Sequence, residues 1–273
     1  MSNLSSSHST NERRPQMYDP SSPLLRSGAA PGGIPQPDAK ARFAEDRLLD
    51  AVVWCEVTPG ETITEADVMD RFGLTRAAAR AALTRLGYDG WAQPLARLGW
   101  QVAPVTGALI GDVLSARRIV EPALAQARLG QAQLDEVTRI GAMLRAVCQQ
   151  PETGAVVTFR HFVDEIDGTL LGAIDTFTAR HLRKLWHHSA RITRHLENAT
   201  SGHVFHRDDI FELVRAVTEG DRDGIIAARH ALIDAQERFF MRQLLKSDTP
   251  IAPGSGAPRH TTPQNAATNR RPS

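Results

Sequence analysis

The sequence predicts a mainly α-helical protein in which an N-terminal winged helix-turn-helix is joined to a C-terminal all-helical bundle. In residues 38–105, three segments with helical spacing of apolar residues precede two short strand-like segments. In residues 106–247, apolar residues recur every three or four positions, and no segment has convincing strand character. The chain has 273 residues, of which 41% are apolar, so two domains of this size can each bury a core.

Cap and turn signals mark the three helices expected in residues 38–105. A Thr-Pro-Gly turn at residues 58–60 ends the first helix. Thr64 and Thr75 are expected N-caps of the second and third helices, which run to about Phe72 and Leu86. Gly73 suits the left-handed position that follows a helix. These signals indicate two helices joined by a very short turn.

The two strand-like segments, residues 91–93 and 100–102, flank a turn over residues 94–99. Gly99 is expected to supply the positive φ that a tight turn needs. A hairpin after three helices is the order of a winged helix-turn-helix.

The remaining segments are expected to be five or six helices and two disordered ends. The helices are placed near residues 107–129, 131–149, 154–174, 178–200, 206–218 and 221–246. Pro122 lies inside the first of these and is expected to kink it or remove one hydrogen bond. Residues 1–37 and 248–273 are rich in Ser, Pro and Gly and are expected to form a disordered arm and tail.

Composition excludes several classes of protein. The balance of 32 Lys+Arg against 31 Asp+Glu excludes a uniformly basic, histone-like chain but permits a local basic face. The two cysteines, Cys55 and Cys148, have no zinc-site spacing and predict a reducing compartment. Because no apolar run reaches ~18 residues and no signal segment is evident, we expect a cytoplasmic protein with no membrane span.

A run of residues from 72 to 83 carries a family resemblance. Phe72-Gly73-Leu74-Thr75-Arg76-Ala77-Ala78-Ala79-Arg80-Ala81-Ala82-Leu83 resembles the LGVSRTPVREAL recognition region of GntR-type transcription regulators. The turn at residues 58–61 resembles the family's PG turn, and residues 99–102 resemble its G-x-x-V wing. Arg118-Ile119-Val120-Glu121 and Gly220-Asp221 resemble the R-x-x-L-E and GD motifs of the FadR-type helical effector (FCD) domain. The resemblance covers residues 40–246, with Ala78 and Ala81 replacing the family's usual Pro and Glu.

The resemblance implies that Thr75, Arg76 and Arg80 contact operator DNA, and the residue chemistry agrees. From Arg71 to Arg97 there are five Arg against a single acid, which indicates a positive face. Arg76 and Arg80 are four apart near the start of a helix, the end that meets base edges in this motif. Each can hold guanine O6 and N7. Arg97, beside Gly99 in the wing, either enters the minor groove or contacts phosphate and aids solubility.

The resemblance also implies a divalent-metal site of one Asp and three His in the helical domain. The aligned positions here are Asp164, Gly168, about Ile210 and about Leu232, so one ligand of four remains. We therefore expect no metal, a dry and apolar bundle interior, and a pocket for an organic effector around these residues. Arg118 is the expected partner of Asp164. His206 and Asp209 leave a rebuilt metal site as an alternative.

Three histidines share one expected helix at seven-residue spacing, namely His181, His188 and His195. Arg residues surround them, so the stripe is either a metal or anion site or, as we favour, an exposed surface. Some of these Arg could bind a carboxylate effector bidentately.

These features predict a sequence-specific DNA-binding transcription regulator, a repressor controlled by a small organic metabolite. We expect a homodimer on double-stranded operator DNA with an inverted repeat. No nucleophile motif, phosphate loop or H-E-x-x-H motif supports an enzyme. The alternatives are an architectural DNA-binding dimer without effector, and a helical enzyme with an appended winged helix. A buried polar constellation away from the DNA-binding domain would favour the enzyme.

Overall fold

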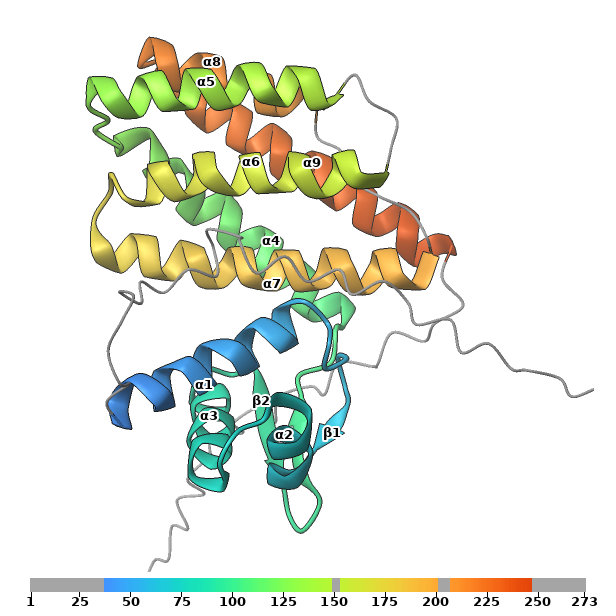
Figure 1. Cartoon of the computed structure of the whole chain (residues 1–273). Helices are drawn as coiled ribbons and strands as arrows, with labels where there is room; N and C mark the ends of the chain where they lie inside the picture. The colour runs from blue at the N-terminus through green and yellow to red at the C-terminus, as the bar shows by residue number, and fades with distance from the viewer. Residues whose placement is uncertain (1–36, 149–152, 201–206, 247–273) are drawn as a thin grey trace, which may run out of the picture.

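The structure, a computed structural model, describes residues 37–148, 153–200 and 207–246, in which a small winged unit lies beside a larger helical bundle (Figure 1). The predicted mainly α fold is confirmed. The predicted tail and all but the last residue of the predicted arm lie outside the described residues. The winged unit comprises α1 (Pro37–Val53), β1 (Thr62–Ile63), α2 (Glu65–Phe72), α3 (Arg76–Tyr88), β2 (Ala92–Leu95) and β3 (Gly99–Val102). The bundle comprises α4 (Gly107–Val120), the 3-10 helix η2 (Glu121–Gln126), α5 (Gln131–Cys148), α6 (Thr153–Leu171), α7 (Thr176–Thr200), α8 (Arg207–Glu219) and α9 (Arg222–Lys246).

Side-chain caps define α2 and α3 where the sequence predicts them. The Thr64 hydroxyl accepts a hydrogen bond from the backbone N–H of Asp67, and the Asp67 carboxylate accepts one from the backbone N–H of Thr64, which completes a capping box. Gly73 ends α2 with φ 64°, in the left-handed region. Thr75 accepts from the backbone N–H of Ala78 and begins α3. The turn between the two helices is therefore three residues long.

The wing is a three-stranded antiparallel sheet in the order β1-β3-β2. β1 was not predicted, because two residues are too few to produce an alternating pattern. β2 extends through Pro94, which pairs with Trp100, so the turn is shorter than predicted. Pro94 is tolerated because β2 is an edge strand.

Each part buries its own apolar core. In the winged unit, α1 packs on α3, and Leu48 and Leu83 of these helices share one buried cluster with Trp91, which follows α3. In the bundle, residues such as Ile166 and Leu213 form a second cluster. None of the described helices is long and apolar enough to cross a bilayer.

Pro122 divides what the sequence predicts as one helix over residues 107–129. α4 ends at Val120, and Pro122 lies in the first turn of η2. Because proline has no N–H to donate, it fits at the start of a helix and not inside one. The expected interruption is therefore a change from α-helix to 3-10 helix.

The two parts meet along α7, which lies between α1 and the rest of the bundle (Figure 1). Ala190 of α7 packs against the apolar core of the winged unit.

Candidate nucleic-acid interface and helical-domain pocket

The N-terminal part of α3 presents the predicted contact residues on one exposed face. Thr75, Arg76 and Arg80 are all exposed, and the opposite side of α3 is buried against α1. Figure 1 shows α2, α3 and the wing on the side of the molecule turned away from the bundle. The residues that the sequence singles out are thus accessible together to a large partner.

Several arginines of this face are held by acidic side chains. Arg80 forms a two-point fork with Glu65, with Nε–Oε1 2.7 Å and Nη2–Oε2 3.1 Å. Arg71 pairs with Glu61 at 2.5 Å. The net positive charge of this face is therefore smaller than the count of five Arg against one acid indicates. Glu61 and Glu65 precede the counted segment in the sequence but pair with its arginines in the fold. Within the described residues, Arg76 and Arg97 make no ion pair.

The wing turn depends on two positive φ angles. Gly99 has φ 108°, as predicted, and a Cβ at this position would lie 2.5 Å from the carbonyl oxygen of Ile63. Arg97 has φ 65°, unusual for a residue with a side chain, and it is exposed beside Leu98. The turn therefore presents a cation and an apolar side chain at the tip of the wing.

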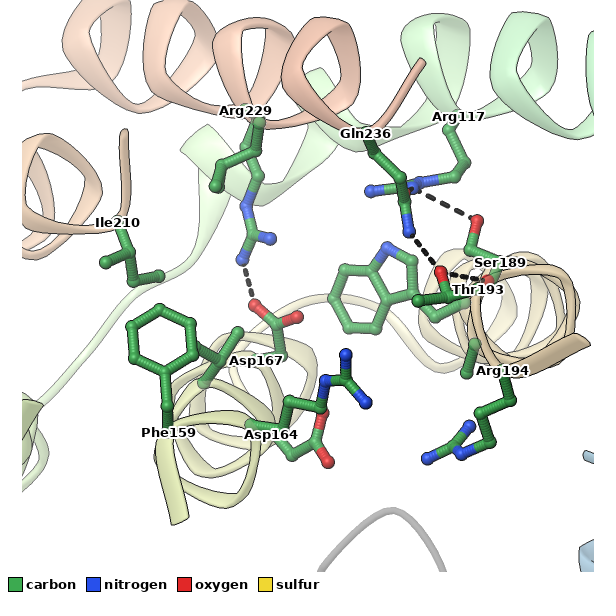
Figure 2. A pocket seen from close by; sticks show the side chains of 15 residues that line it. Arg117, Phe159, Asp164, Asp167, Ser189, Thr193, Arg194, Ile210, Arg229 and Gln236 are labelled. Atoms are coloured by element: carbon green, nitrogen blue, oxygen red, sulfur yellow. Dashed lines mark hydrogen bonds and ion pairs between the residues drawn. The ribbon is translucent and has the colours of Figure 1, made fainter. Parts of the chain in front are cut away.

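The bundle contains a cavity of about 170 Å³ between α4, α6, α7, α8 and α9 (Figure 2). Of the five residues that the sequence places around an effector pocket, Asp164, Ile210 and Leu232 line this cavity, whereas Arg118 and Gly168 do not. The full lining consists of Arg117, Phe159, Arg160, Val163, Asp164, Asp167, Trp186, Ser189, Ala190, Thr193, Arg194, Ile210, Arg229, Leu232 and Gln236.

Arg118 is not the partner of Asp164. Its Nη2 bonds Asp234 Oδ1 at 2.7 Å and Glu237 Oε2 at 2.5 Å, on the surface of α9. The neighbouring Arg117 faces the cavity instead, because successive helix residues point in directions about 100° apart. Gly168 is half-buried, and beyond its own helix no atom lies within 4 Å of where a Cβ would be.

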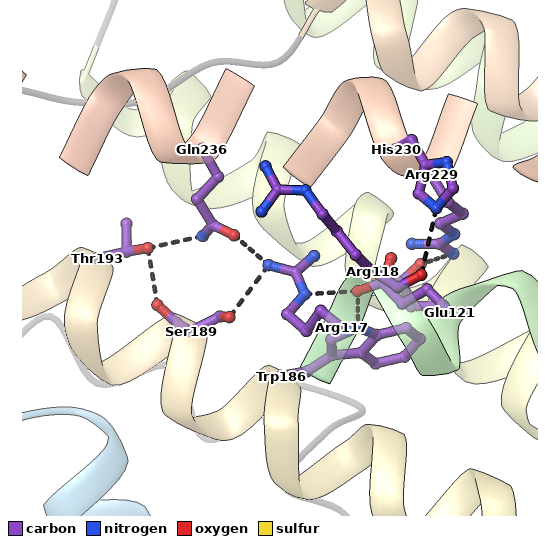
Figure 3. Close-up of polar contacts among 10 residues, drawn as sticks. Arg117, Arg118, Glu121, Trp186, Ser189, Thr193, Arg229, His230 and Gln236 are labelled. Carbon is purple, nitrogen blue, oxygen red and sulfur yellow. Dashed lines mark hydrogen bonds and ion pairs between the residues drawn. The ribbon is translucent and has the colours of Figure 1, made fainter. Parts of the chain in front are cut away.

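The bundle interior is polar on one side of the cavity, and the expectation of a dry, apolar interior is wrong. Arg117 Nε donates to Glu121 Oε1 at 2.5 Å, and Trp186 Nε1 donates to the same oxygen at 2.8 Å (Figure 3). Arg117 Nη1 donates to Ser189 Oγ at 3.0 Å, and Arg117 also bonds Gln236. The side chain of Glu121 is fully buried, so this network holds α4, η2, α7 and α9 together inside the protein.

A second buried ion pair joins Asp167 of α6 to Arg229 of α9. Burial alone would lower the pKa of Arg229, but the carboxylates of Asp167 and Glu121 raise it. The sequence does not predict either pair. Asp167 and Arg229 lie 62 residues apart, and although Arg117 and Glu121 are only four apart, their other partners Trp186 and Ser189 lie 65 and 72 residues away. The one available signal was the spacing of Arg117 and Glu121, at i and i+4 of an expected helix.

No metal cluster occurs in the part of the chain that the structure describes, where no three His, Cys, Asp or Glu side chains are placed to hold an ion. Ile210 and Leu232 offer no ligand atoms. His206, part of the alternative site, lies outside the described residues.

In the histidine stripe of α7, His181 is exposed, as we favour from the sequence, whereas His188 and His195 are half-buried. His188 stacks on Trp91 of the winged unit, with ring centroids 3.8 Å apart. Burial, followed by the charge of Arg191, lowers the pKa of His188 to about 3, so it is neutral at physiological pH. Arg191, also on this side of α7, donates to the carbonyl oxygen of Ala103 at 2.7 Å. Within the stripe, His188 is therefore a contact with the winged unit.

Solved structures share this architecture. McbR/YncC of E. coli has 15% sequence identity and a TM-score of 0.60, and the match covers 76% of this chain and 98% of that one. A Rhodococcus sp. RHA1 protein, described as a GntR transcriptional regulator, has 19% identity and a TM-score of 0.55 over 76% of this chain and 98% of its own. No protein-family model and no curated protein sequence matches the chain. At these identities the likeness establishes a shared fold, that of GntR-type regulators, which the sequence motifs predict.

Proposed function

We propose that this protein is a sequence-specific DNA-binding transcription regulator. The main support is the exposed N-terminal face of α3 within a complete winged helix-turn-helix. Thr75, Arg76 and Arg80 lie on this face. In this geometry α3 enters the major groove, where Arg side chains read guanine edges. Arg97, with Gly99 shaping the turn, contacts the adjacent minor groove or phosphates. The fold shared with a GntR regulator supports the same function.

We further propose that the bundle cavity binds a small organic metabolite without a metal, and that the protein is a repressor released by this ligand. The lining joins Asp164, Ile210 and Leu232 with buried Arg side chains, a mixed surface suited to an organic molecule with one polar end. The protomer acts as a homodimer, because one winged helix reads one half-site of an inverted repeat.

A helical enzyme is the second candidate, since the cavity does hold a buried polar constellation. Five of its members are nevertheless engaged with one another: Arg117 with Glu121, Asp167 with Arg229, and Ser189 with Arg117. A catalytic serine needs a general base within reach, whereas the Ser189 hydroxyl accepts a hydrogen bond from the Arg117 guanidinium. This arrangement favours structural ion pairs over a reactive group.

The proposal is tested by selecting duplexes from a random DNA pool with the full-length protein and then measuring variants on the selected site and on random DNA. Arg80→Ala should weaken binding to the selected site by about tenfold to a hundredfold more than binding to random DNA. Arg139→Ala, which removes an exposed ion pair with Glu136 on α5, is the matched control and should change neither affinity. Equal losses on both DNAs would mean that Arg80 contacts only phosphate, and failure to enrich any sequence would refute the proposed function.

A further inference from the structure

Arg194 of α7 belongs to the pocket and to the domain interface at once. It lines the cavity together with Asp164 and Thr193 (Figure 2). Its guanidinium carbon also lies 3.6 Å from the ring centroid of Trp54, the residue that follows α1 in the winged unit. At this separation the guanidinium rests on the face of the indole. A single side chain thus connects the cavity to the winged unit.

Among the residues that the structure describes, no carboxylate forms an ion pair with Arg194, unlike the other arginines of the cavity. Arg117, Arg160 and Arg229 pair with Glu121, Glu197 and Asp167. The side chain of Arg194 is almost completely buried, yet its Nε and Nη1 have no hydrogen-bond partner among the described residues. Burial, and then Arg160, lowers the pKa of Arg194 to about 10, with Asp164 acting in the opposite direction, so the group is still a cation at neutral pH. A buried cation with unused donors is unfavourable until an acceptor reaches it.

The remaining lining defines which acceptor fits. A carboxylate matches the charge and geometry of a guanidinium. Asp164 lines the same cavity and repels negative charge on a ligand. A ligand with a single carboxylate therefore fits better than phosphate or a dicarboxylate. Phe159, Ile210 and Leu232 provide apolar surface for a hydrocarbon body.

We infer that Arg194 couples the pocket to the DNA-binding unit: a small monocarboxylate held by Arg194 fixes the guanidinium on Trp54 and strengthens the docking of the winged unit on the bundle. The guanidinium N–H groups lie in the plane of the group, so a carboxylate binds at its edge while the face stays on the indole. The consequence is that ligand binding restricts how the two winged helices of a dimer reach their half-sites. This consequence rests on the proposed function.

The test follows from thermodynamic reciprocity. If ligand binding strengthens the stacking of Arg194 on Trp54, then the stacking must raise the affinity for the ligand by the same factor. Trp54 does not line the cavity. A change at Trp54 therefore alters ligand affinity only through Arg194. His188, which stacks on Trp91 in the same interface without lining the cavity, gives the matched control.

The experiment measures binding of benzoate and hexanoate, with benzamide and hexanamide as neutral counterparts, by calorimetry and thermal shift at up to tens of millimolar ligand. The wild-type protein should bind the carboxylates at least about tenfold more tightly than the amides, and Arg194→Gln should abolish this preference. Trp54→Leu should weaken carboxylate binding by about tenfold, whereas Trp54→Phe, which keeps a ring, and His188→Ala should stay close to wild type. Circular dichroism checks that each variant is folded.

The inference is overturned if no carboxylate is preferred over its amide, or if Trp54→Leu leaves the preference unchanged. These outcomes are separate from the proposed function, which is judged by DNA selection. Enrichment of a DNA site without an Arg194-dependent preference would refute the coupling alone. If the carboxylate preference depends on Arg194 and Trp54 but no DNA site is enriched, the proposed regulator function is refuted and Arg194 remains the link between the two domains.

Discussion

The fork between Glu65 and Arg80 leads to a specific prediction about DNA discrimination. Glu65 is the first residue of α2 and holds Nε and one Nη of Arg80, whose side chain is 67% exposed. The other end of the guanidinium remains open for guanine O6 and N7. Glu65 therefore orients Arg80, and on DNA without the correct guanine its carboxylate cancels the charge that Arg80 would offer to a phosphate.

Glu65→Gln should increase affinity for random DNA and decrease discrimination. Freeing one cation to neutralise one phosphate steepens the plot of log K against log salt by about 0.9. At ~0.15 M salt this corresponds to about fivefold tighter binding to random duplexes. Affinity for the selected site should change less, because Arg80 already contacts a base there. The ratio of specific to random affinity should therefore fall by up to about fivefold.

Fluorescence anisotropy over a range of salt concentrations, on the selected and a scrambled duplex, measures both the slope and the ratio. Glu136→Gln is the matched control, since Glu136 also holds an arginine fork, that of Arg139, on α5 in the bundle. It makes the same change in net charge and should leave the ratio unaltered. An unchanged salt slope for Glu65→Gln, or the same change in both variants, would show that the fork has no part in recognition.

Four further predictions concern stability, pH and assembly. Gly99→Ala should destabilise the winged unit by about 1–3 kcal/mol in chemical denaturation, because φ 108° and a carbonyl of β1 leave no room for a Cβ; an unaltered midpoint would contradict this. Glu121→Ala should cost about 3–5 kcal/mol, because it leaves buried Arg117 without its carboxylate and the Trp186 N–H without its acceptor; Glu121→Gln should cost less, and the same assay ranks the two. Burial, and then the Asp46 carboxylate, raises the pKa of Asp50 from 3.8 to about 7, so ionisation disfavours the folded state and wild-type stability should fall as pH rises from about 4 to 7. Asp50→Asn should lessen that fall. The same free energy of unfolding at both ends of this pH range in the wild-type protein would contradict the prediction. Sedimentation at micromolar concentration should give a dimer, and a monomer with and without DNA would refute the two-fold model.

Local signals in the sequence were sufficient for the element order and for the exposed face of α3. Thr64, Gly73 and Thr75 act on their own neighbours through caps and a left-handed turn, so their roles can be predicted without knowing the fold. The same holds for Gly99, whose positive φ belongs to the wing turn itself. β1 is the exception among the elements, because its two residues become a strand only by pairing with β3.

The pocket was predicted only in part, because alignment to a motif places backbone positions and says little about side-chain partners. Asp164, Ile210 and Leu232 reach the cavity, whereas Arg118 turns to Asp234 and Glu237 on the surface. The cavity's polar character comes from charged residues on α4, α6 and α9 that pair only after the helices have packed.

The sequence by itself determined the winged helix-turn-helix, the helical bundle and the exposed residues at the start of α3, because these depend on periodicity and on interactions a few residues apart. Only the tertiary structure decided that Glu65 holds Arg80, that Glu121 is buried against Arg117 and Trp186, and that Arg194 stacks on Trp54. Trp54 and Arg194 are 140 positions apart in the chain, and no local pattern encodes a contact over such a separation. It forms because the packing of the winged unit on the bundle brings α7 against α1.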